Sequence, residues 1–467
     1  MPASSQNKEV IPMGKRTYRA ADIKDLKVES LAPTLAGRVV LGVDVAKKKQ
    51  LVSITTEDRT SVAIFKWSHP EETPLFTALC EDLRERGLTV EIAMEPSGTY
   101  GDAMRCKLLS LKFDVYQVAG KRVHDAAEVF DGVPSTHDAK AAVLIARLHL
   151  DKASKRWPMA SATERELEAR RQEMAVHSSR EQSLLGKLEA LIARHWPELT
   201  EHLGLTAVTL LELLAHYGGP AQVAADLDAA RALMAKIGKR FLAPETIDAV
   251  LKSAGSTAGV PMLAAEESLV RVIADEALDA HRKAAIARKG LVKATANEVA
   301  PEMSALLGAV TAATIVACGV DPRKYKSARA LEKAFGLNLR EHSSGTKKGG
   351  LHITKRGDSM ARQVLYMATL RLILNDPIAA AWYRKKVARD GGESTPERRG
   401  NSKIKAVVAL MRKLVKGLWH VGRGVAFDAT KLFNVQRLGL PAPSPAATDQ
   451  KQTTAQPAAI VQKEVTA

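Results

Sequence analysis

A strand-like apolar run that carries one acidic residue is the feature that most constrains the fold of this chain. Residues 38–45 read Arg-Val-Val-Leu-Gly-Val-Asp-Val, so Asp44 lies within a segment that otherwise predicts a buried strand. An isolated acidic residue is usually a solvated surface group, but burying an unpaired charge is costly. The position of Asp44 therefore makes it a candidate functional residue.

The segments that follow indicate the fold class. Two further strands are predicted at 51–55 and 61–65, and together the three strands form a meander. The chain then predicts a helix at 75–86, a strand at 89–94, a helix at 102–111, a strand at 113–118 and a helix at 138–150. Three strands, helix, strand, helix, strand, helix is the order of the α/β ribonuclease-H-like fold.

Acidic residues occur at three places that such a fold brings together. Asp44 lies in the first strand, Glu95 at the end of the fourth strand, and Asp138 at the start of the last helix. In a ribonuclease-H-like fold these places converge at one edge of the sheet. Carboxylate oxygens gathered there suit Mg²⁺ or Mn²⁺, and paired ions can stabilise both oxygens of a phosphoryl displacement.

Helical patterns dominate from Ser161 onward. Ser161 and Glu164 form a capping-box pattern, and apolar residues between 184 and 192 mark a stripe. We expect 161–196 to form a long helix that could pair with a second copy, although its heptads are imperfect. Residues 200–300 are rich in Ala and Leu and predict further helices without identifiable chemistry.

Positive charge is concentrated in one segment. The chain has a net charge of +17, and residues 321–424 contain 24 Lys and Arg against eight Asp and Glu, an excess of 16. A solvated basic face is the alternative, but such segregation favours a polyanion bound through its phosphates. Aromatic residues make up only 4% of the chain, which argues against recognition mainly by base stacking.

A serine-bearing loop lies inside this basic segment. Ser343 and Ser344 precede Gly345, and Lys347 and Lys348 follow. Asp358 can then cap a helix with apolar residues at helical spacing, at 361, 364, 365, 368 and 372. The loop is suited to bringing a serine to a phosphate, and a basic surface turn is the alternative.

Several classes of protein are disfavoured. No run approaches the roughly 20 apolar residues that span a membrane, so no membrane partner is expected. The first residues contain no signal-peptide core, and we expect a cytoplasmic protein. Three scattered cysteines, at 80, 106 and 318, fit neither a disulfide framework nor a zinc site.

Taken together, these motifs resemble the DEDD transposases of the insertion-sequence 110/1111 family, whose relatives include the Piv-type DNA invertases. The resemblance is carried by residues 41–47, 94–100, 138–142 and 145–146 and, further on, by residues 308–313, 335–337, 343–345 and 355–357. These motifs flank most of residues 38–375 and occur in the order of the family.

The resemblance implies a RuvC-like domain with four acids, joined by a helical coiled coil to a domain with a nucleophilic serine. Family members recombine DNA as oligomers, and in characterised cases a structured bridge RNA specifies the DNA sites. By this resemblance Asp44, Glu95 and Asp138 are the first three acids and bind Mg²⁺ or Mn²⁺. Ser344 is the nucleophile, with Ser343 as the less favoured choice. The expected nucleic-acid-binding residues are Lys347, Lys348, Lys355, Arg356 and Arg362, and the expected partners are DNA, a bridge RNA and further copies in a dimer or tetramer.

The expected domains follow from these patterns and from the resemblance. They are a flexible arm at 1–37, a RuvC-like catalytic domain at 38–155 and a helical coiled-coil region at 156–300, followed by a basic, mainly α-helical transposase domain at 301–437 and a disordered tail at 438–467.

Two departures from the family pattern leave alternatives open. The fourth acid falls three residues after the third, where this chain has Ala141, and the Pro-Gly-x-Gly hairpin before Thr311 is degenerate. An alanine at residue 141 leaves three alternatives. A substitute ligand such as His137 could complete the metal site, catalysis could be weaker, or the chain could be a catalytically impaired relative that still binds DNA and RNA. A sugar-kinase-like or actin-like ATPase ranks last, because residues 46–49 lack a Gly- or Thr-rich phosphate hairpin.

Overall fold

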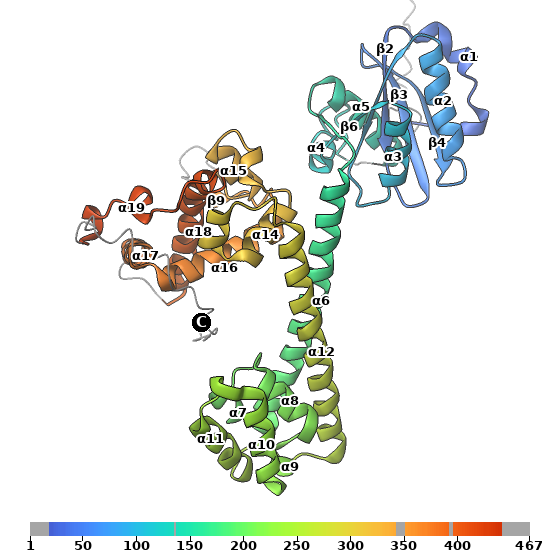
Figure 1. Cartoon of the computed structure of the whole chain (residues 1–467). Coiled ribbons are helices and arrows are strands. Elements are labelled where there is room, and N and C mark those ends of the chain that lie inside the picture. Colours follow the sequence, from blue (N-terminus) through green and yellow to red (C-terminus); the bar gives the residue numbers. More distant parts are fainter. Residues whose placement is uncertain (1–17, 135–136, 342–350, 392–395, 441–467) are drawn as a thin grey trace, which may run out of the picture. The chain divides into compact units, whose positions relative to one another are not determined.

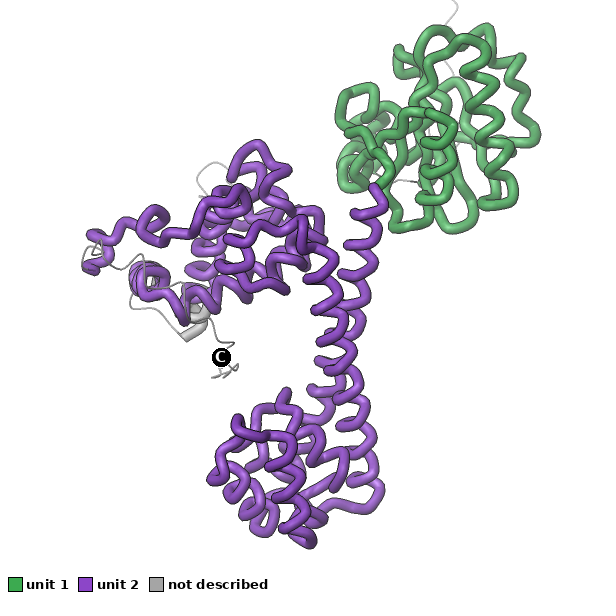
Figure 2. Tube along the Cα trace, in the orientation of Figure 1, with its two compact units in different colours: residues 1–160 green, residues 161–467 purple. Residues whose placement is uncertain are grey.

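The computed structural model describes residues 18–134, 137–341, 351–391 and 396–440 and, within these, the side chains outside 390–401. The chain divides into two compact units, residues 1–160 and 161–467, which Figure 2 shows in different colours.

A mixed sheet is the centre of the first unit (Figure 1). Its strands, among the described residues, are β1 (Ala21–Asp22), β2 (Arg38–Asp44), β3 (Lys49–Thr56), β4 (Ser61–Ser68), β5 (Thr89–Met94), β6 (Asp114–Gln117) and β7 (Lys155–Arg156). They lie in the order β1-β4-β3-β2-β5-β6-β7. Strands β2, β3 and β4 are antiparallel neighbours, whereas β5 and β6 continue parallel to β2. The α/β ribonuclease-H-like class predicted from the sequence is confirmed.

Helices cover both faces of this sheet. On one face α2 (Thr73–Glu85) and α3 (Asp102–Ser110) contribute Phe76 and Leu108 to a core that includes Leu41 of β2. On the other face α4 (Gly120–Asp125) and α5 (Asp138–Leu150) pack around Val40. Because successive side chains of a strand point to opposite faces, this double cover explains the nearly continuous apolar run of β2.

Residues 18–37, which were expected to belong to a flexible arm, contain short elements and buried side chains that pack on the sheet of the first unit. Strand β1 pairs in parallel with β4, and α1 (Val28–Leu31) follows it. The side chains of Ile23 and Leu35 are buried in the core of the unit. Two well-separated apolar anchors produce no periodicity, so the sequence pattern did not reveal this packing.

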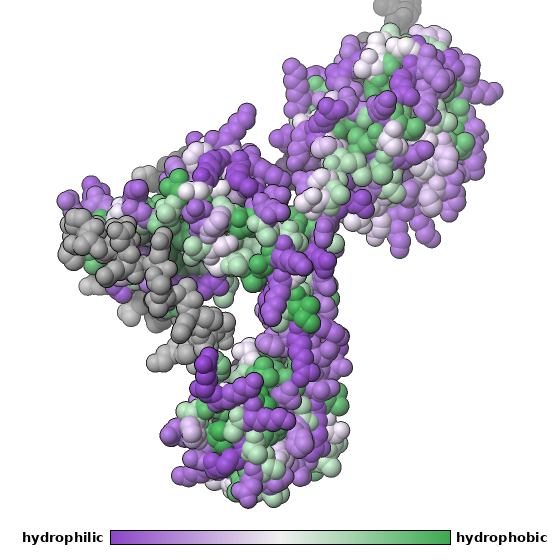
Figure 3. Space-filling model, in the orientation of Figure 1, coloured by the Kyte–Doolittle hydropathy of each residue, from purple (hydrophilic) through white to green (hydrophobic). Residues whose placement is uncertain are grey.

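The second unit begins with two long helices that pair within one chain. Helix α6 (Ala162–His195) starts with the predicted capping box of Ser161 and Glu164 and packs along α12 (Ala264–Ala294). The stripe of α6 that was expected to face a second copy is instead covered internally, since Leu188 and Ile192 share a core with Val270 and Leu278. The visible surface of the pair is largely hydrophilic (Figure 3).

A small helical bundle connects these two helices. It contains α7 (Leu199–His202), α8 (Val208–Tyr217), α9 (Pro220–Ala225), α10 (Leu227–Gly238) and α11 (Pro244–Gly255). The chain returns close to the point where it left α6, because the N–H of Val260 donates to the carbonyl of Arg194 at 2.9 Å. His195 Nδ1 also donates to the carbonyl of Val260 at 2.8 Å.

The rest of the second unit is a helical domain that contains a two-stranded hairpin. Its elements are α13 (Pro301–Leu307), α14 (Ala309–Ala317), α15 (Ala328–Ala334), β8 (Leu339–Arg340), β9 (His352–Ile353), α16 (Ser359–Asn375), α17 (Pro377–Gly391), α18 (Pro396–Val421) and α19 (Ala429–Leu432). Phe335, Leu365 and Leu414 are fully buried in its core. Within the described part of the chain, no single helix is long and apolar enough to cross a membrane; α16 and α17 pass this test only as a pair bent by 103°.

Candidate functional site

Asp44 ends the central strand β2 on the face that carries α5. Residues 40, 42 and 44 share this face because strand side chains alternate. Helix α5 approaches so closely at Gly42 that a Cβ there would lie 2.2 Å from the carbonyl oxygen of Ala142. The close packing at Gly42 therefore places the Asp44 side chain beside the start of α5.

Glu95 reaches the same edge of the sheet from the neighbouring strand. Strands β2 and β5 are parallel, and Val43 pairs with Met94, so Asp44 and Glu95 are the next residues in register. The Glu95 carboxylate lies against the first residue of α4, since a Cβ at Gly120 would be 2.1 Å from its Oε1. Glu95 is thus held between the end of β5 and α4.

Asp138 is the first residue of α5 and is exposed. His137 caps this helix, because its Nδ1 accepts a hydrogen bond from the backbone N–H of Lys140 at 3.3 Å. The His137 ring also packs edge-on against Tyr18, with ring centroids 5.3 Å apart. His137, considered as a substitute metal ligand, therefore has one ring nitrogen engaged in capping.

The pKa of Asp44 reflects the presence of the other two carboxylates near it. Burial raises the pKa of Asp44 from 3.8 to about 6, and the negative charges of Asp138 and Glu95 contribute to the increase. Burial also raises the pKa of Glu95. Among the described residues, however, no three His, Cys, Asp or Glu side chains gather closely enough to hold a metal ion by themselves.

The second unit contains the other predicted site residues. Ser343, Ser344, Lys347 and Lys348 lie outside the described residues, on the connection between β8 and β9. Asp358 caps α16 as predicted, accepting from the N–H of Ala361 at 2.7 Å.

The remaining predicted nucleic-acid-binding residues have different environments. Lys355 and Arg356 are exposed, and Lys355 has a positive φ of 55°. Arg362 is partly buried, and its guanidinium donates to the carbonyls of Phe335 at 3.1 Å and Gly357 at 3.4 Å. Arg362 therefore holds the turn before α16 in place.

Comparison with known protein families matches both parts of this arrangement. A DEDD transposase model of the IS110 group matches residues 41–196, which include the acidic cluster and α6. A second model, described as Transposase IS116/IS110/IS902 family, matches residues 307–384, which include the hairpin and α16. The chain belongs to the IS110 family of DEDD transposases. No curated protein matches the chain.

The residue at which the sequence resemblance places the fourth acid is apolar and buried in this IS110-family transposase. Ala141 lies one turn after Asp138, is 9% exposed and packs in the cluster that contains Val40 and Ala93. A methyl group there contributes to the core under the sheet edge but offers no oxygen ligand.

Two residues near the acids were missed by the sequence analysis. Gly120 limits the space available to Glu95, and nothing in its local sequence marks it. Lys140 is 2% exposed and donates to Asp131 Oδ1 at 2.8 Å and to the carbonyl of Val133 at 2.7 Å. Tyr18 donates to Asp131 Oδ2 at 3.1 Å. A lysine within the apolar stretch 139–146 was a signal that this side chain has a specific buried partner.

Proposed function

We propose that this transposase cleaves and rejoins DNA through the hydroxyl of Ser344, assisted by a divalent-metal site at Asp44, Glu95 and Asp138. The observation that carries the proposal is the electrostatic coupling of these carboxylates at one sheet edge. Two further negative charges near the partly buried carboxylate of Asp44 cost free energy in the absence of a cation. Carboxylates with perturbed pKa values of this kind are typical of functional sites.

The chemistry of the donor set fits Mg²⁺ or Mn²⁺. Carboxylate oxygens are the hard ligands that Mg²⁺ prefers, and Mg²⁺ commonly keeps several waters and uses one or two carboxylates with substrate phosphate oxygens. Such a site needs no closed cage of protein side chains, and water can take the place that Ala141 leaves. When bound, the metal supplies charge stabilisation for the oxygens of a phosphoryl displacement.

The proposed reaction exchanges one phosphate ester for another. Ser344 Oγ attacks a DNA phosphorus, a Ser–O–P bond forms, and the bond from phosphorus to one deoxyribose oxygen breaks. The proton lost by the serine hydroxyl balances the proton gained by the departing deoxyribose oxygen. Reversal with a different deoxyribose hydroxyl rejoins the strands, and basic side chains of the second unit stabilise the phosphate charge.

A structured bridge RNA and further copies of the chain are the proposed partners. The positive excess of 16 within residues 321–424 supports binding of nucleic acid by the second unit. The family resemblance supports RNA guidance and a dimer or tetramer. Because the apolar stripe of α6 is covered by α12, such an oligomer requires other surfaces.

Ala141 favours a second candidate function, a relative that binds DNA and RNA without recombining them. Detection of covalent protein–DNA adducts separates the two candidates. The full chain is incubated with Mg²⁺, RNA transcribed from the non-coding end of its element and labelled DNA that carries the ends of that element, and adducts are resolved under denaturing conditions. We expect an adduct for the unmodified protein and for Ser343→Ala, but none for Ser344→Ala, with DNA binding nearly unchanged. Absence of an adduct from the unmodified protein would favour the binding-only candidate, and an adduct lost only with Ser343→Ala would identify the other hydroxyl.

A further inference from the structure

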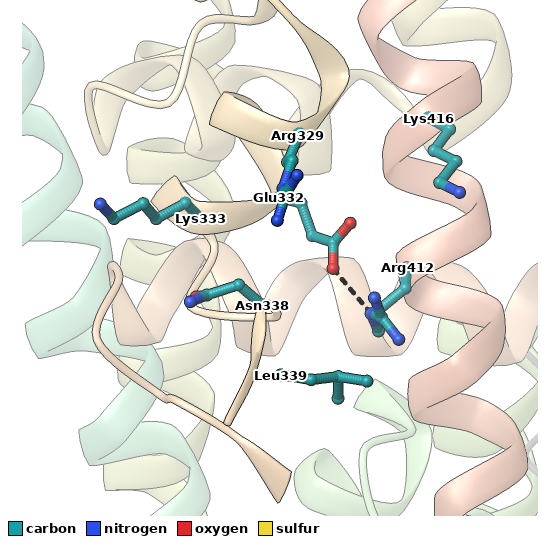
Figure 4. A pocket seen from close by; sticks show the side chains of 7 residues that line it. All are labelled: Arg329, Glu332, Lys333, Asn338, Leu339, Arg412 and Lys416. Atoms are coloured by element: carbon teal, nitrogen blue, oxygen red, sulfur yellow. Dashed lines mark hydrogen bonds and ion pairs between the residues drawn. The ribbon is translucent and has the colours of Figure 1, made fainter. Parts of the chain in front are cut away.

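A basic pocket of about 620 Å³ lies between α15, β8 and α18 in the second unit (Figure 4). Arg329 and Lys333 line it from α15, and Arg412 and Lys416 line it from α18. Glu332 is the one acidic residue in the lining. The pocket thus surrounds a single carboxylate with four cationic side chains. All four lie in the basic segment 321–424, but none was among the individual residues expected to contact nucleic acid.

Three of the four cations have no partner for their charge within the described part of the chain. The side chains of Arg329, Lys333 and Lys416 form neither a hydrogen bond nor an ion pair with any residue that the structure describes. Other arginines of the unit are paired with carboxylates; Arg323, for example, lies 2.9 Å from Asp321. Cations that converge on a hollow without counter-charges create a positive potential that attracts an anion.

The fourth cation is held in place by the single carboxylate. Glu332 has an 8% exposed side chain and accepts from Nε of Arg412 at 2.7 Å. Figure 4 shows the two side chains facing each other. A guanidinium bound through Nε retains its terminal N–H groups as donors, and such donors match the geometry of phosphate oxygens. Glu332 therefore orients Arg412 toward the pocket.

We propose that this pocket binds the backbone phosphates of a nucleic-acid strand, with Arg329, Lys333, Arg412 and Lys416 as ligands and Glu332 as the residue that positions Arg412. The proposal rests on the proposed function in so far as the strand belongs to the DNA or RNA that the transposase handles. It assigns a binding role to side chains outside both the acidic cluster and the serine loop.

The size and lining of the pocket favour a strand over a free anion. Pockets of roughly 300–1,000 Å³ accommodate ligands much larger than one phosphate group. Leu339 is exposed beside the cations and supplies an apolar contact for a sugar or base. Leu339 belongs to β8, and β8 leads directly into the segment that contains Ser344. A nucleic-acid strand bound in the pocket therefore contacts the same β-hairpin that carries the proposed nucleophile.

Salt dependence of binding tests the pocket in the full-length protein. Affinity for a duplex DNA, a single-stranded DNA and a structured RNA is measured by fluorescence anisotropy over a series of salt concentrations. Each phosphate contact contributes about 0.9 to the slope of log affinity against log salt for duplex DNA and about 0.7 for single strands. The double variant Arg412→Gln with Lys416→Gln removes two cations from the pocket. For the nucleic acid that occupies the pocket, we expect the magnitude of the slope to fall by about the contribution of two phosphate contacts.

The matched control removes two exposed lysines from the helical bundle, Lys236→Gln with Lys252→Gln, which lowers the net charge by the same amount. A slope lowered equally by the control and the pocket variant, or unchanged in the pocket variant, overturns the proposal. Loss of slope for only one type of strand supports it and identifies that strand. Inorganic phosphate is added at constant ionic strength as a further arm. If it displaces the nucleic acid from the unmodified protein but not from the pocket variant, the strand occupies the pocket through its phosphates. If phosphate binds to the pocket without lowering the affinity for any of the nucleic acids, the pocket takes the free anion and the strand assignment is wrong.

Replacing Glu332 provides a further test, because the net charge of the protein and the orientation of Arg412 predict opposite changes in affinity for nucleic acid. Glu332→Ala makes the protein more positive, so charge alone predicts tighter binding. We expect weaker binding, because Arg412 loses its orienting partner, and recovery with Glu332→Gln, whose side-chain carbonyl can still accept from Nε. Thermal unfolding confirms that each variant is folded. Tighter binding by Glu332→Ala would contradict the positioning role.

Failure of this proposal is distinguishable from failure of the proposed recombination. The pocket is tested by binding, which Ser344→Ala leaves nearly unchanged, whereas recombination is tested by the covalent adduct.

Discussion

The carboxylate of Glu95 lies against the backbone of Gly120 so closely that a Cβ on that glycine would be 2.1 Å from Oε1 and 2.8 Å from Cδ. Carbon and oxygen atoms that are not bonded do not approach to this distance. The contact joins the end of β5 to the first residue of α4, two elements that are adjacent in space but separated by α3 and β6 in sequence. Gly120 therefore determines where one of the three acids can lie.

Replacing Gly120 tests this contact directly. In Gly120→Ala the added methyl group displaces the Glu95 carboxylate, and we expect DNA cleavage to fall about as far as in Glu95→Gln. Stability should change little, since alanine is acceptable at the start of a helix. Gly186→Ala is the control, because no atom lies within 4 Å of its added Cβ. There we expect unchanged cleavage and a gain of about 0.5–1 kcal/mol in the free energy of unfolding. Cleavage by Gly120→Ala at the unmodified rate would show that Glu95 can move without consequence.

Restoring an acid at residue 141 should strengthen metal-dependent activity. A carboxylate in Ala141→Asp lies one helical turn from Asp138 and can add an oxygen ligand. We expect faster recombination and a lower Mg²⁺ requirement. Without metal, the same variant should be less stable than the unmodified protein, because Ala141 is buried and a fourth negative charge joins the cluster.

The control for this prediction is Ala141→Asn, which has nearly the same size as the aspartate variant but no charge. It separates the effect of the carboxylate from the effect of overfilling the cluster around Val40. The measurement is a Mg²⁺ titration of strand exchange together with thermal unfolding with and without metal. An identical Mg²⁺ requirement in all three proteins would mean that residue 141 does not contribute to the site.

The raised pKa of Asp44 predicts how stability depends on pH in metal-free protein. The pKa of Asp44 is about 6 in the folded state and has an ordinary value of 3.8. The folded state therefore retains a proton that the unfolded state loses, and stability decreases as the pH rises from about 4 to about 6. A pKa difference of this size corresponds to about 3 kcal/mol, which partial exposure reduces to the order of 1 kcal/mol.

We accordingly expect metal-free Asp44→Asn to unfold at a higher temperature than the unmodified protein at neutral pH, with the difference shrinking as the pH falls toward 4. Glu57→Gln, which neutralises an exposed carboxyl in a turn of the same unit, should not show this pattern. Differential scanning calorimetry over this pH range checks the result. Equal unfolding temperatures for Asp44→Asn and the unmodified protein at neutral pH would contradict the burial and charge coupling of Asp44.

The centre of the sheet was predictable because β2 and most of β5 are buried on both faces. The apolar run at 38–45 and the run at 89–94 correspond to β2 and β5, and the order of elements led directly to the fold class. The partner of α6 was not predictable, because the apolar spacing shows that a face is covered but not by which helix. The two-residue strands β7, β8 and β9 are too short to produce an alternating pattern.

The sequence predicted the residues of the acidic cluster but not the residues that surround them. Asp44, Glu95 and Asp138 could be named because the order of strands and helices places all three positions at one edge of a ribonuclease-H-like sheet. Gly120 could not be named, since its role is a distance to a residue 25 positions away and leaves no trace in the surrounding sequence. Lys140 was visible as a charged residue in an apolar helix, but its partner Asp131 depends on the path of the loop before Asp138.

The chain returns at Val260 to the end of α6. The length of the helix pair therefore does not depend on the bundle of helices that connects α6 to α12. At about 1.5 Å per residue, the 34 residues of α6 extend about 51 Å, and this length is set by the helix alone. The bundle between His195 and Val260 begins and ends at the same place, because hydrogen bonds join Val260 to the last turn of α6. That loop can therefore lengthen, shorten or be exchanged during evolution while the helices keep their register. The helix pair thus keeps a fixed length, while the bundle at its end can be replaced.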